Sequence, residues 1–272
     1  MSAASEIDAI AVELMRLLGA GSQITPFSQR HPGFDLAQAY RVVTRLAALR
    51  RARGEIPIGR KIGFTNKAIW RGLGLSGPVW NYVFDRTVIF AGDGGPEVSL
   101  AGMPEPRIEP ELVLHLASAP AAGMTEAELL ACIDWIAPGF EIVQSIFPDW
   151  SFSAADAAAA YGVHGALVVG RQLDIADTRA QVASALEDFA VRLEGGEGVI
   201  REGRAENVLG GPLRALRFLV EEVARFPGSE PLGPGEIVTT GTLTEAMPAR
   251  PGEAWQASFE GIALRPIRLR FC

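Results

Sequence analysis

Arg107-Ile-Glu-Pro-Glu111, followed at once by an apolar run that begins at Leu112, is the stretch from which the fold can be read. Strand side chains alternate between two faces, so Glu109 and Glu111 should share one face of a half-buried strand. A second apolar run, Pro138-Gly-Phe-Glu-Ile-Val143, offers a third carboxylate, Glu141.

Two carboxylates on an inward face repel each other and are costly to desolvate unless a cation lies between them. Hard divalent cations such as Mg²⁺ take carboxylate oxygens, so one interpretation is a metal held by Glu109, Glu111 and Glu141. The alternative is that Glu109 and Glu111 line the solvated face of an edge strand, with Pro110 marking the edge. The spacing alone leaves both interpretations open, because E-x-E is a common pattern.

Composition excludes several classes of protein. The 272 residues, 48% hydrophobic and 21% charged, are typical of a globular protein. A net charge of −7 without any basic run argues against nucleic acid as a partner, and no apolar run reaches the roughly 18 residues of a membrane span. Residues 1–8 do not resemble a signal peptide. Cys132 and Cys272 read as free thiols, so we expect a cytoplasmic protein.

The first 54 residues have helical periodicity. Apolar positions predict a helix over residues 5–18, and a capping box at Asp35 and Gln38 predicts a second helix that runs to about Arg53. We interpret residues 1–54 as a helical N-terminal cap and residues 55–272 as a separate domain.

From Ile56 onward, short apolar segments are separated by Gly and Pro, which is typical of strands. Strands are expected at 59–65, 80–90 (broken in its middle), 165–170, 235–241 and 255–270, with a hairpin over 189–201. Capping boxes predict helices after Thr125, running to just before Pro138, and after Ser153, and Pro212 begins another that reaches Phe226. Few helices separate the strands, so the sequence predicts an α+β fold with a mixed, largely antiparallel β-core and peripheral helices.

Several ordered segments together resemble one family. They are Gly59-Arg-Lys-Ile-Gly-Phe-Thr-Asn-Lys67, Pro106-Arg-Ile-Glu-Pro-Glu111, Phe140-Glu-Ile142, Asn207-Val-Leu-Gly-Gly-Pro212 and Val238-Thr-Thr-Gly-Thr242. The set is similar to the 2-keto-4-pentenoate hydratase and 4-oxalocrotonate decarboxylase family, within the fumarylacetoacetate hydrolase superfamily, over residues 35 to 272.

This resemblance implies a β-roll catalytic domain over residues 55–272 that carries Mg²⁺ or Mn²⁺ on Glu109, Glu111 and Glu141. It also implies a small-molecule 2-oxo or 2-hydroxydienoic acid as substrate and a homo-oligomer as the assembly. Three protein ligands leave positions on an octahedral ion for a bidentate 2-oxo acid and a water. The metal would polarise the 2-oxo group while water adds at C4.

The same resemblance implies roles for two charged side chains. Lys61 matches the lysine of the family's G-x-K-I-G motif, where it would bind the substrate carboxylate or carry a proton; the alternative is a strand lysine that points to solvent. Asp85 matches a family aspartate that would pair with Lys61, and a turn aspartate is the alternative.

Several polar residues are candidates for binding the substrate. Thr240, Gly241 and Thr242 match a Thr-Thr-Gly segment whose glycine allows close approach of the ligand, although an ordinary strand end would read the same. Gln144 and Ser145 follow Glu141 closely, and one of them could line the pocket. Arg107 would be a counter-charge for the acidic pair or a residue of the pocket rim.

The chain departs from the family pattern after Asp156. Related hydratases carry Asp-Asn-Ala-Ser there, whereas this chain continues with four alanines and then Tyr161-Gly-Val-His164. His164 becomes a candidate general acid or base, because imidazole titrates near neutrality; a structural role is the alternative. His31, in the cap, and His115, beside the acidic pair, are expected to be a loop and a core histidine.

We therefore expect a hydratase of aromatic meta-cleavage catabolism, a hydro-lyase that adds water to a 2-hydroxydienoate such as 2-hydroxypenta-2,4-dienoate. Three alternatives stay open: decarboxylation of a 4-oxalocrotonate-like substrate, which needs an extra distal cation; C–C hydrolysis of an acylpyruvate, which needs His31 or His164 as base; and a non-catalytic partner of such an enzyme.

Overall fold

The computed structural model describes residues 3–67, 70, 77–196, 198–226 and 228–272. A nine-stranded mixed sheet forms its centre, with its main path in the order β2-β1-β11-β5-β6-β7-β3, while β12 pairs with β5 and β8 pairs with β6. The strands are β1 (Pro57–Gly63), β2 (Val79–Phe84), β3 (Val88–Gly92), β5 (Arg107–Leu116), β6 (Ile133–Val143), β7 (His164–Gly170), β8 (Leu173–Asp174), β11 (Ile237–Thr239) and β12 (Met247–Pro248).

A second sheet of five strands has the order β10-β9-β13-β14-β4. Its strands are β4 (Glu97–Val98), β9 (Ala190–Gly195), β10 (Val199–Arg204), β13 (Ala254–Glu260) and β14 (Ile267–Phe271). Only β1–β11, β3–β7 and β4–β14 pair in parallel among the described strands, so the predicted mixed, largely antiparallel core is confirmed.

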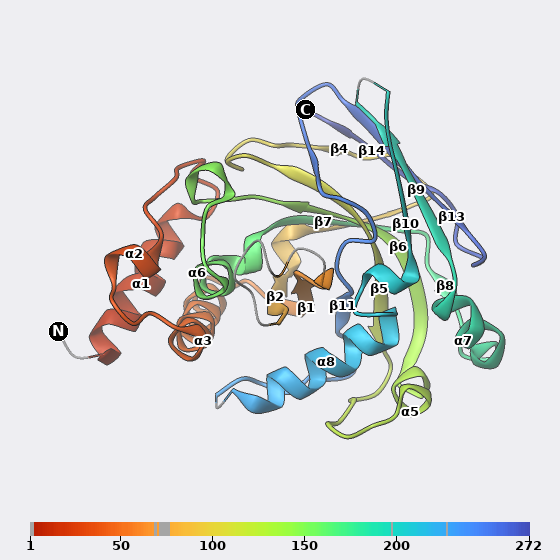
Figure 1. Ribbon diagram of the computed structural model, residues 1–272, viewed down its shortest axis with the longest axis horizontal. Coiled ribbons are helices and arrows are strands. Elements are labelled where there is room, and N and C mark those ends of the chain that lie inside the picture. Colours follow the sequence, from red (N-terminus) through yellow and green to blue (C-terminus); the bar gives the residue numbers. More distant parts are fainter. Residues whose placement is uncertain (1–2, 68–69, 71–76, 197, 227) are drawn as a thin grey trace.

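Helices lie around the sheets. They are α1 (Ala3–Leu17), α2 (Phe27–Arg30), α3 (Leu36–Ala52), α5 (Glu126–Ala131), α6 (Ala154–Ala159), α7 (Arg179–Glu187) and α8 (Pro212–Arg225), with short 3₁₀ turns at Asp85–Thr87, Pro148–Trp150, Tyr161–Val163 and Ala205–Asn207. Figure 1 shows α1–α3 beside α6 on one side of the molecule and the five-stranded sheet on the opposite side. Among the described residues, no helix has the length and apolarity that crossing a membrane requires.

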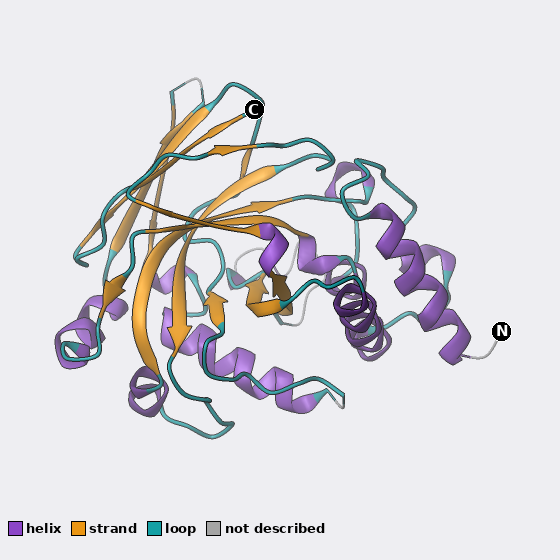
Figure 2. Ribbon diagram, turned by 180° about the vertical axis from the view of Figure 1, so that it is seen from behind, coloured by secondary structure: helices purple, strands orange, loops and turns teal. Residues whose placement is uncertain are grey.

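The central strand pair, β5–β6, has two different faces. Ile108, Leu112 and Leu114 point into the main core, which also includes residues of the five-stranded sheet and of the N-terminal helices. The alternate positions carry Glu109 and Glu111 and then Val113, which packs in a smaller apolar cluster. Figure 2 shows these long strands running through the middle of the molecule.

The edge-strand alternative for Glu109 and Glu111 is wrong. Strand β5 lies between β11 and β6, and Pro110 pairs with Phe140 in the interior of the sheet. Proline has no N–H to donate there, but its carbonyl still accepts a hydrogen bond from the Leu243 amide at 2.9 Å.

Most expected elements agree with the structure, including the capping boxes of α3, α5 and α6. The helix expected to run to Pro138 ends at Ala131, because Ile133–Ala137 pair with β5 instead. This segment contains two isoleucines and a tryptophan, residue types that favour strands when they can pack against a neighbouring strand. Helix α7 was not expected, since Thr178 gives it no side-chain cap.

The N-terminal helices are tied to the rest of the chain by a buried carboxylate. Asp156 accepts hydrogen bonds from Ser28 N at 2.9 Å and Ser28 Oγ at 2.6 Å, and from Ser153 N at 2.9 Å and Ser153 Oγ at 2.7 Å. The Asp156 carboxylate thus accepts four hydrogen bonds, two from the N-cap residue of α6 and two from a residue in α2. The division into domains at residue 54 stays a prediction.

We expect Asp156→Asn to lower the free energy of unfolding by about 2–3 kcal/mol, because the amide NH₂ cannot accept a hydrogen bond and would face donors. Urea denaturation measures the loss. Asp35→Asn is the matched control and should change little, because asparagine also caps helices. Equal stability of the Asp156 variant and the wild type would contradict this role.

Candidate metal centre and substrate pocket

Strands β5 and β6 bring three carboxylates together. Glu109 and Glu111 lie on the same face of β5, and Glu109 is paired with Glu141 across the two strands. One carboxylate oxygen from each residue lies within 4.8 Å of the other two. Glu111 and Glu141 are buried, while Glu109 is half-buried and lines a cleft.

Glu141 is the carboxylate that Lys61 and His164 hold in place. Its Oε2 lies 3.2 Å from Lys61 Nζ and its Oε1 lies 2.7 Å from His164 Nδ1. Burial alone would raise the pKa of Glu141, but the charge of Lys61 and the hydrogen bond from His164 outweigh it and lower that pKa. Glu141 is therefore ionised and fixed in orientation.

Glu109 and Glu111 have pKa values above the ordinary range of a glutamate. Burial, followed by the repulsion of Glu141, raises the pKa of Glu109 to about 7, with Lys61 opposing the rise. Burial and the charges of Glu141 and Glu109 also raise the pKa of Glu111 well above its ordinary value. Lys61 responds in the opposite sense: burial would lower its pKa, yet the three carboxylates together raise it.

One buried oxygen of the cluster has no donor. Glu111 Oε2 accepts from Gly241 N at 2.9 Å, but Glu111 Oε1 makes no hydrogen bond, and Glu141 Oε2 has only the ion pair with Lys61 at 3.2 Å. Buried acceptors are rarely left unsatisfied without a functional reason. Three clustered carboxylates with one lysine and an unsatisfied oxygen suit a hard divalent cation, which takes oxygen ligands and neutralises their charge.

The cleft beside the cluster has a volume of about 730 Å³. It is lined by Lys61, Gly63, Phe64, Thr65, Asn66, Arg107, Glu109, Trp150, Phe152, Val163, Glu202, Asn207, Thr242, Thr244, Glu245 and Ala246. One wall is apolar and the buried end is charged, which is typical of a small-molecule site.

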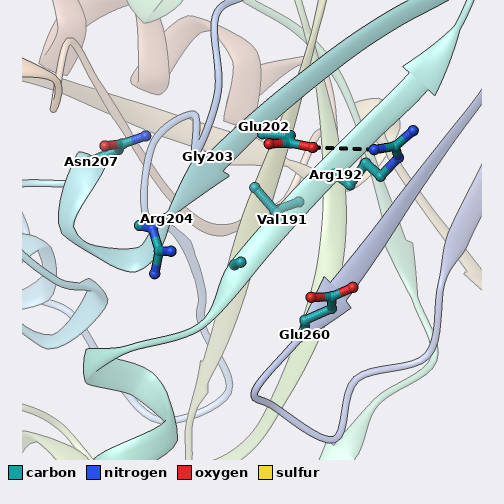
Figure 3. A pocket seen from close by; sticks show the side chains of 8 residues that line it. Val191, Arg192, Glu202, Gly203, Arg204, Asn207 and Glu260 are labelled. Carbon is teal, nitrogen blue, oxygen red and sulfur yellow. Dashed lines mark hydrogen bonds and ion pairs between the residues drawn. The ribbon is translucent and has the colours of Figure 1, made fainter.

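A smaller pocket of about 470 Å³ lies next to this cleft and shares Glu202 and Asn207 with it. Figure 3 shows Arg192 and Glu202 facing each other across β9 and β10, as an ion pair of 3.1 Å. Because these charges already neutralise each other, the carboxylate cluster is the better candidate for chemistry.

The Thr-Thr-Gly segment lies at the site with roles that differ from residue to residue. Thr240 is fully buried and donates its hydroxyl to Leu112 O at 3.1 Å, so it does not reach the cleft. Thr242 lines the cleft. Gly241 has φ +95°, and a Cβ there would lie 2.1 Å from Thr65 Oγ1, so this position requires glycine.

Two expected site residues lie elsewhere. Asp85 does not pair with Lys61; its carboxylate accepts from Ile56 N at 2.9 Å. Gln144 does not line the cleft, because it donates to His164 O at 3.2 Å and faces a pocket formed with Arg50 and Thr87. The sequence did not show that the strand containing Glu141 ends before Gln144.

His164 is buried behind the carboxylates and does not line the cleft. Its Nδ1 faces Glu141, and its Nε2 lies 2.9 Å from Thr87 Oγ1. It therefore orients a carboxylate and has no contact with the cavity. His31 pairs with Glu6 outside the cleft. His115 was expected in the core but is only half-buried, and it stacks on Trp135 at 4.6 Å beside Asp134.

Left-handed backbone gathers around the cleft, a feature that sequence reasoning missed. Phe64, Trp150 and Val163 line it with φ of 60°, 53° and 60°. Such conformations are costly for bulky residues and persist where the surrounding structure enforces them, often at binding sites. Thr65 was missed too: its buried hydroxyl has no hydrogen-bond partner.

Residues 78–266 match the family model described as the fumarylacetoacetate (FAA) hydrolase C-terminal family. The chain belongs to this family. The recognition made from the ordered motifs is thereby confirmed.

Curated proteins of related sequence include hydratases. The chain is 29% identical over 271 residues to a 2-hydroxyhexa-2,4-dienoate hydratase of Comamonas testosteroni, covering 98% of this chain and 99% of that protein. It is 30% identical over 223 residues to a 2-hydroxypent-2,4-dienoate hydratase of Pseudomonas putida, covering 81% and 96%. The expectation of a hydro-lyase similar to 2-keto-4-pentenoate hydratase is confirmed.

A solved structure has the same fold. The 4-oxalocrotonate decarboxylase of Pseudomonas putida G7, complexed with magnesium and adipate, superimposes with a TM-score of 0.89 over 98% of both chains at 22% identity. This match supports the β-roll architecture expected of the family.

Removal of divalent metal should destabilise the protein increasingly as the pH rises. Because their pKa values are raised in the fold, Glu109 and Glu111 bind more protons in the metal-free fold than in the unfolded chain. Their contribution to stability is therefore full near pH 4 and is lost as the pH rises through about 7. We expect thermal denaturation to show a larger stabilisation by Mg²⁺ at about pH 8 than at about pH 5. The double variant Glu109→Gln/Glu111→Gln should lose this response, and an equal shift at both pH values would contradict it.

We expect His164→Leu to weaken the binding of Mn²⁺ by about 10–100-fold, because Glu141 loses the partner that orients it. Titration calorimetry measures the affinity. His115→Leu is the control, since His115 pairs with Asp134 outside the cluster. Unchanged affinity in the His164 variant would exclude the positioning role.

Proposed function

We propose that this chain is a metal-dependent hydratase that adds water to a 2-hydroxy-2,4-dienoate and forms a 4-hydroxy-2-oxo acid, in aromatic meta-cleavage catabolism. The observation that carries the proposal is the cluster of Glu109, Glu111 and Glu141 with Lys61 at the buried end of a cleft. Nearly full-length similarity to dienoate hydratases supports the choice of reaction.

Glu109, Glu111 and Glu141 would hold the ion, with Mg²⁺ or Mn²⁺ as the expected species. When bound, the ion supplies Lewis acidity that polarises the 2-oxo group of the substrate. The side chains of this protein supply the rest: Glu141 is kept ionised by Lys61 and His164, and Gly241 N fixes Glu111. Such preorganisation means that little reorientation is needed during the reaction.

Lys61 is the proton-carrying group that we assign to the site. It lines the cleft, donates to Gly162 O at 2.8 Å, and has a raised pKa that keeps it charged. As an acid it would protonate C5 of the dienoate, while the 2-hydroxyl group gives up its proton to restore the charge of Lys61, so that the isomerisation to the 2-oxo-3-enoate leaves the number of protons unchanged. Water then adds with its hydroxyl at C4 and its proton at C3.

Two of the alternatives have less support. Acylpyruvate hydrolysis needs a histidine base, but His164 is turned toward Glu141, and His31 pairs with Glu6. A non-catalytic partner would have no use for three clustered carboxylates, one of which has a buried oxygen without a donor. Decarboxylation would use the same polarised 2-oxo group, and the experiment below separates it from hydration. The homo-oligomer and the cytoplasmic location stay predictions.

The test uses protein stripped with EDTA, then reloaded with Mg²⁺ or Mn²⁺ and given 2-hydroxypenta-2,4-dienoate. We expect loss of the dienoate ultraviolet absorbance with 4-hydroxy-2-oxopentanoate as product. Glu109→Gln should lower kcat at least about 100-fold, and Lys61→Met should lower it by about 100–10,000-fold.

Glu194→Gln, which removes an exposed carboxylate on β9, is the matched control and should keep full activity. Carbon dioxide release from 4-oxalocrotonate without hydration of any dienoate would replace hydratase by decarboxylase. Full activity after metal removal would exclude both a metal-dependent hydratase and a metal-dependent decarboxylase.

A further inference from the structure

A second cavity lies where the N-terminal helices meet the β-core, and among the described residues it shares none with the cleft. Its volume is about 390 Å³, which is enough for a small molecule. The ends of α1 and α3, the 3₁₀ turn at Asp85–Thr87, residues 101–103, Gln144 and Gly165 form its walls. This cavity is therefore separate from the pocket in which we place the reaction.

The lining of this cavity is basic, although the chain as a whole has a net charge of −7. It includes the guanidinium groups of Arg50, Arg53 and Arg86 and one carboxylate, that of Glu55. Arg50 is buried and already neutralised, because its Nε lies 2.8 Å and its Nη2 2.6 Å from Glu55 Oε2. Its guanidinium also stacks over the ring of Phe84 at 3.8 Å. Arg50 is thus a fixed part of the wall.

Arg53 and Arg86 carry positive charge that the fold does not neutralise closely. Their side chains are 56% and 72% exposed, and Arg53 Nε lies 3.6 Å from Glu55 Oε1 while Arg86 Nε lies 3.9 Å from Asp85 Oδ2. Both distances are longer than a hydrogen bond, and Glu55 is bonded to Arg50. The guanidinium fork matches the oxygens of carboxylate and phosphate groups, so two such groups on one cavity suit an oxyanion.

Two polar residues of the same lining contact His164. Thr87 Oγ1 lies 2.9 Å from His164 Nε2, and Gln144 Nε2 donates to His164 O at 3.2 Å. The other ring nitrogen, His164 Nδ1, lies 2.7 Å from Glu141 Oε1. An anion in this cavity would therefore lie on the side of His164 opposite the carboxylate cluster.

We propose that this cavity is an effector site that binds a small oxyanion, with carboxylate or phosphate groups, through Arg53 and Arg86. The bound anion strengthens metal binding at the carboxylate cluster, because opposite charges on the two sides of His164 attract each other through the protein. Coupling between two sites is reciprocal, so the metal strengthens the binding of the anion by the same factor. The effect on the metal rests on the proposed function, whereas the binding of the anion does not.

Sulfate and succinate test the binding, as a tetrahedral and a dicarboxylate dianion. Calorimetry with the Mg²⁺-loaded protein should give a Kd below about 1 mM for at least one of them. Tighter binding of sulfate would indicate a phosphate group on the natural ligand, and tighter binding of succinate would indicate carboxylates. No Kd below about 1 mM for either anion would overturn the proposal.

Variants assign the binding to this cavity. Arg53→Gln and Arg86→Gln should each weaken it at least about 10-fold, because each removes charge-assisted hydrogen bonds. Arg268→Gln removes an arginine that bonds to Gln256 on the five-stranded sheet, and should bind the anion as the wild type does. Unchanged binding in both cavity variants, or an equal loss in Arg268→Gln, would overturn the site.

The double variant Glu109→Gln/Glu111→Gln separates the cavity from the metal itself. It should bind the anion at most about 5-fold more weakly than the wild type, which is the loss expected when the coupled metal no longer binds. Complete loss of anion binding in this variant would mean that the anion binds the metal ion in the cleft, and would overturn the proposal.

Titration with Mn²⁺ tests the coupling. Saturating anion should tighten Mn²⁺ binding about 5-fold in the wild type and leave it unchanged in Arg53→Gln/Arg86→Gln, which also corrects for any binding of Mn²⁺ by the free anion. An equal change in both proteins would overturn the effector role. A chain that binds the anion as expected and hydrates no dienoate would overturn the hydratase alone, and a hydratase without the anion site would overturn this inference alone.

Discussion

The constraint on which the rest of the site depends is the burial of three carboxylates on neighbouring central strands. Glu109, Glu111 and Glu141 offer oxygens within 4.8 Å of one another in a place largely removed from water. Ionised carboxylates at that spacing repel one another strongly, and burial adds a desolvation cost. Lys61 and His164 outweigh this cost for Glu141, whose pKa is lowered, whereas Lys61 opposes it only in part for Glu109 and Glu111, whose pKa values stay raised. The remaining charge is what makes a divalent cation the expected occupant of the site.

The surroundings of the cluster are built largely from backbone groups. Gly241 N bonds to Glu111, and Gly162 O accepts from Lys61. Both glycines have positive φ, and a Cβ at Gly162 would lie 3.0 Å from Asn81 and 3.1 Å from Lys61. Backbone donors and acceptors hold their positions without loss of side-chain entropy. The lysine and the carboxylates are thus fixed by turns whose geometry only glycine adopts readily.

Sequence reasoning found the cluster because strand periodicity and one ordered set of motifs both pointed to the same residues. It could not place Asp85 or Gln144, because a motif says that a polar residue is near a strand end and not which way the chain turns afterwards. The 3₁₀ turn at Asp85–Thr87 directs Asp85 to Ile56 N, and the end of β6 directs Gln144 away from the cleft. The residues of the cleft wall could not be predicted from the sequence either. Phe64, Trp150 and Val163 have left-handed backbone conformations that their residue types disfavour.

The segment after Asp156 shows how a departure from the family pattern can leave the carboxylate site intact. Here Asp156 binds Ser28 and Ser153, the alanines of α6 pack in the core, and Tyr161 donates its hydroxyl to Leu14 O. These contacts hold the helical N-terminal region against the β-core. The groups of this segment that meet the site are the Gly162 carbonyl, Val163 in the cleft and His164 behind Glu141. A change of side chains at 157–160 therefore alters the packing of the N-terminal helices against the β-core. The Gly162 carbonyl, which accepts from Lys61, keeps its position because the turn at Tyr161–Val163 sets it.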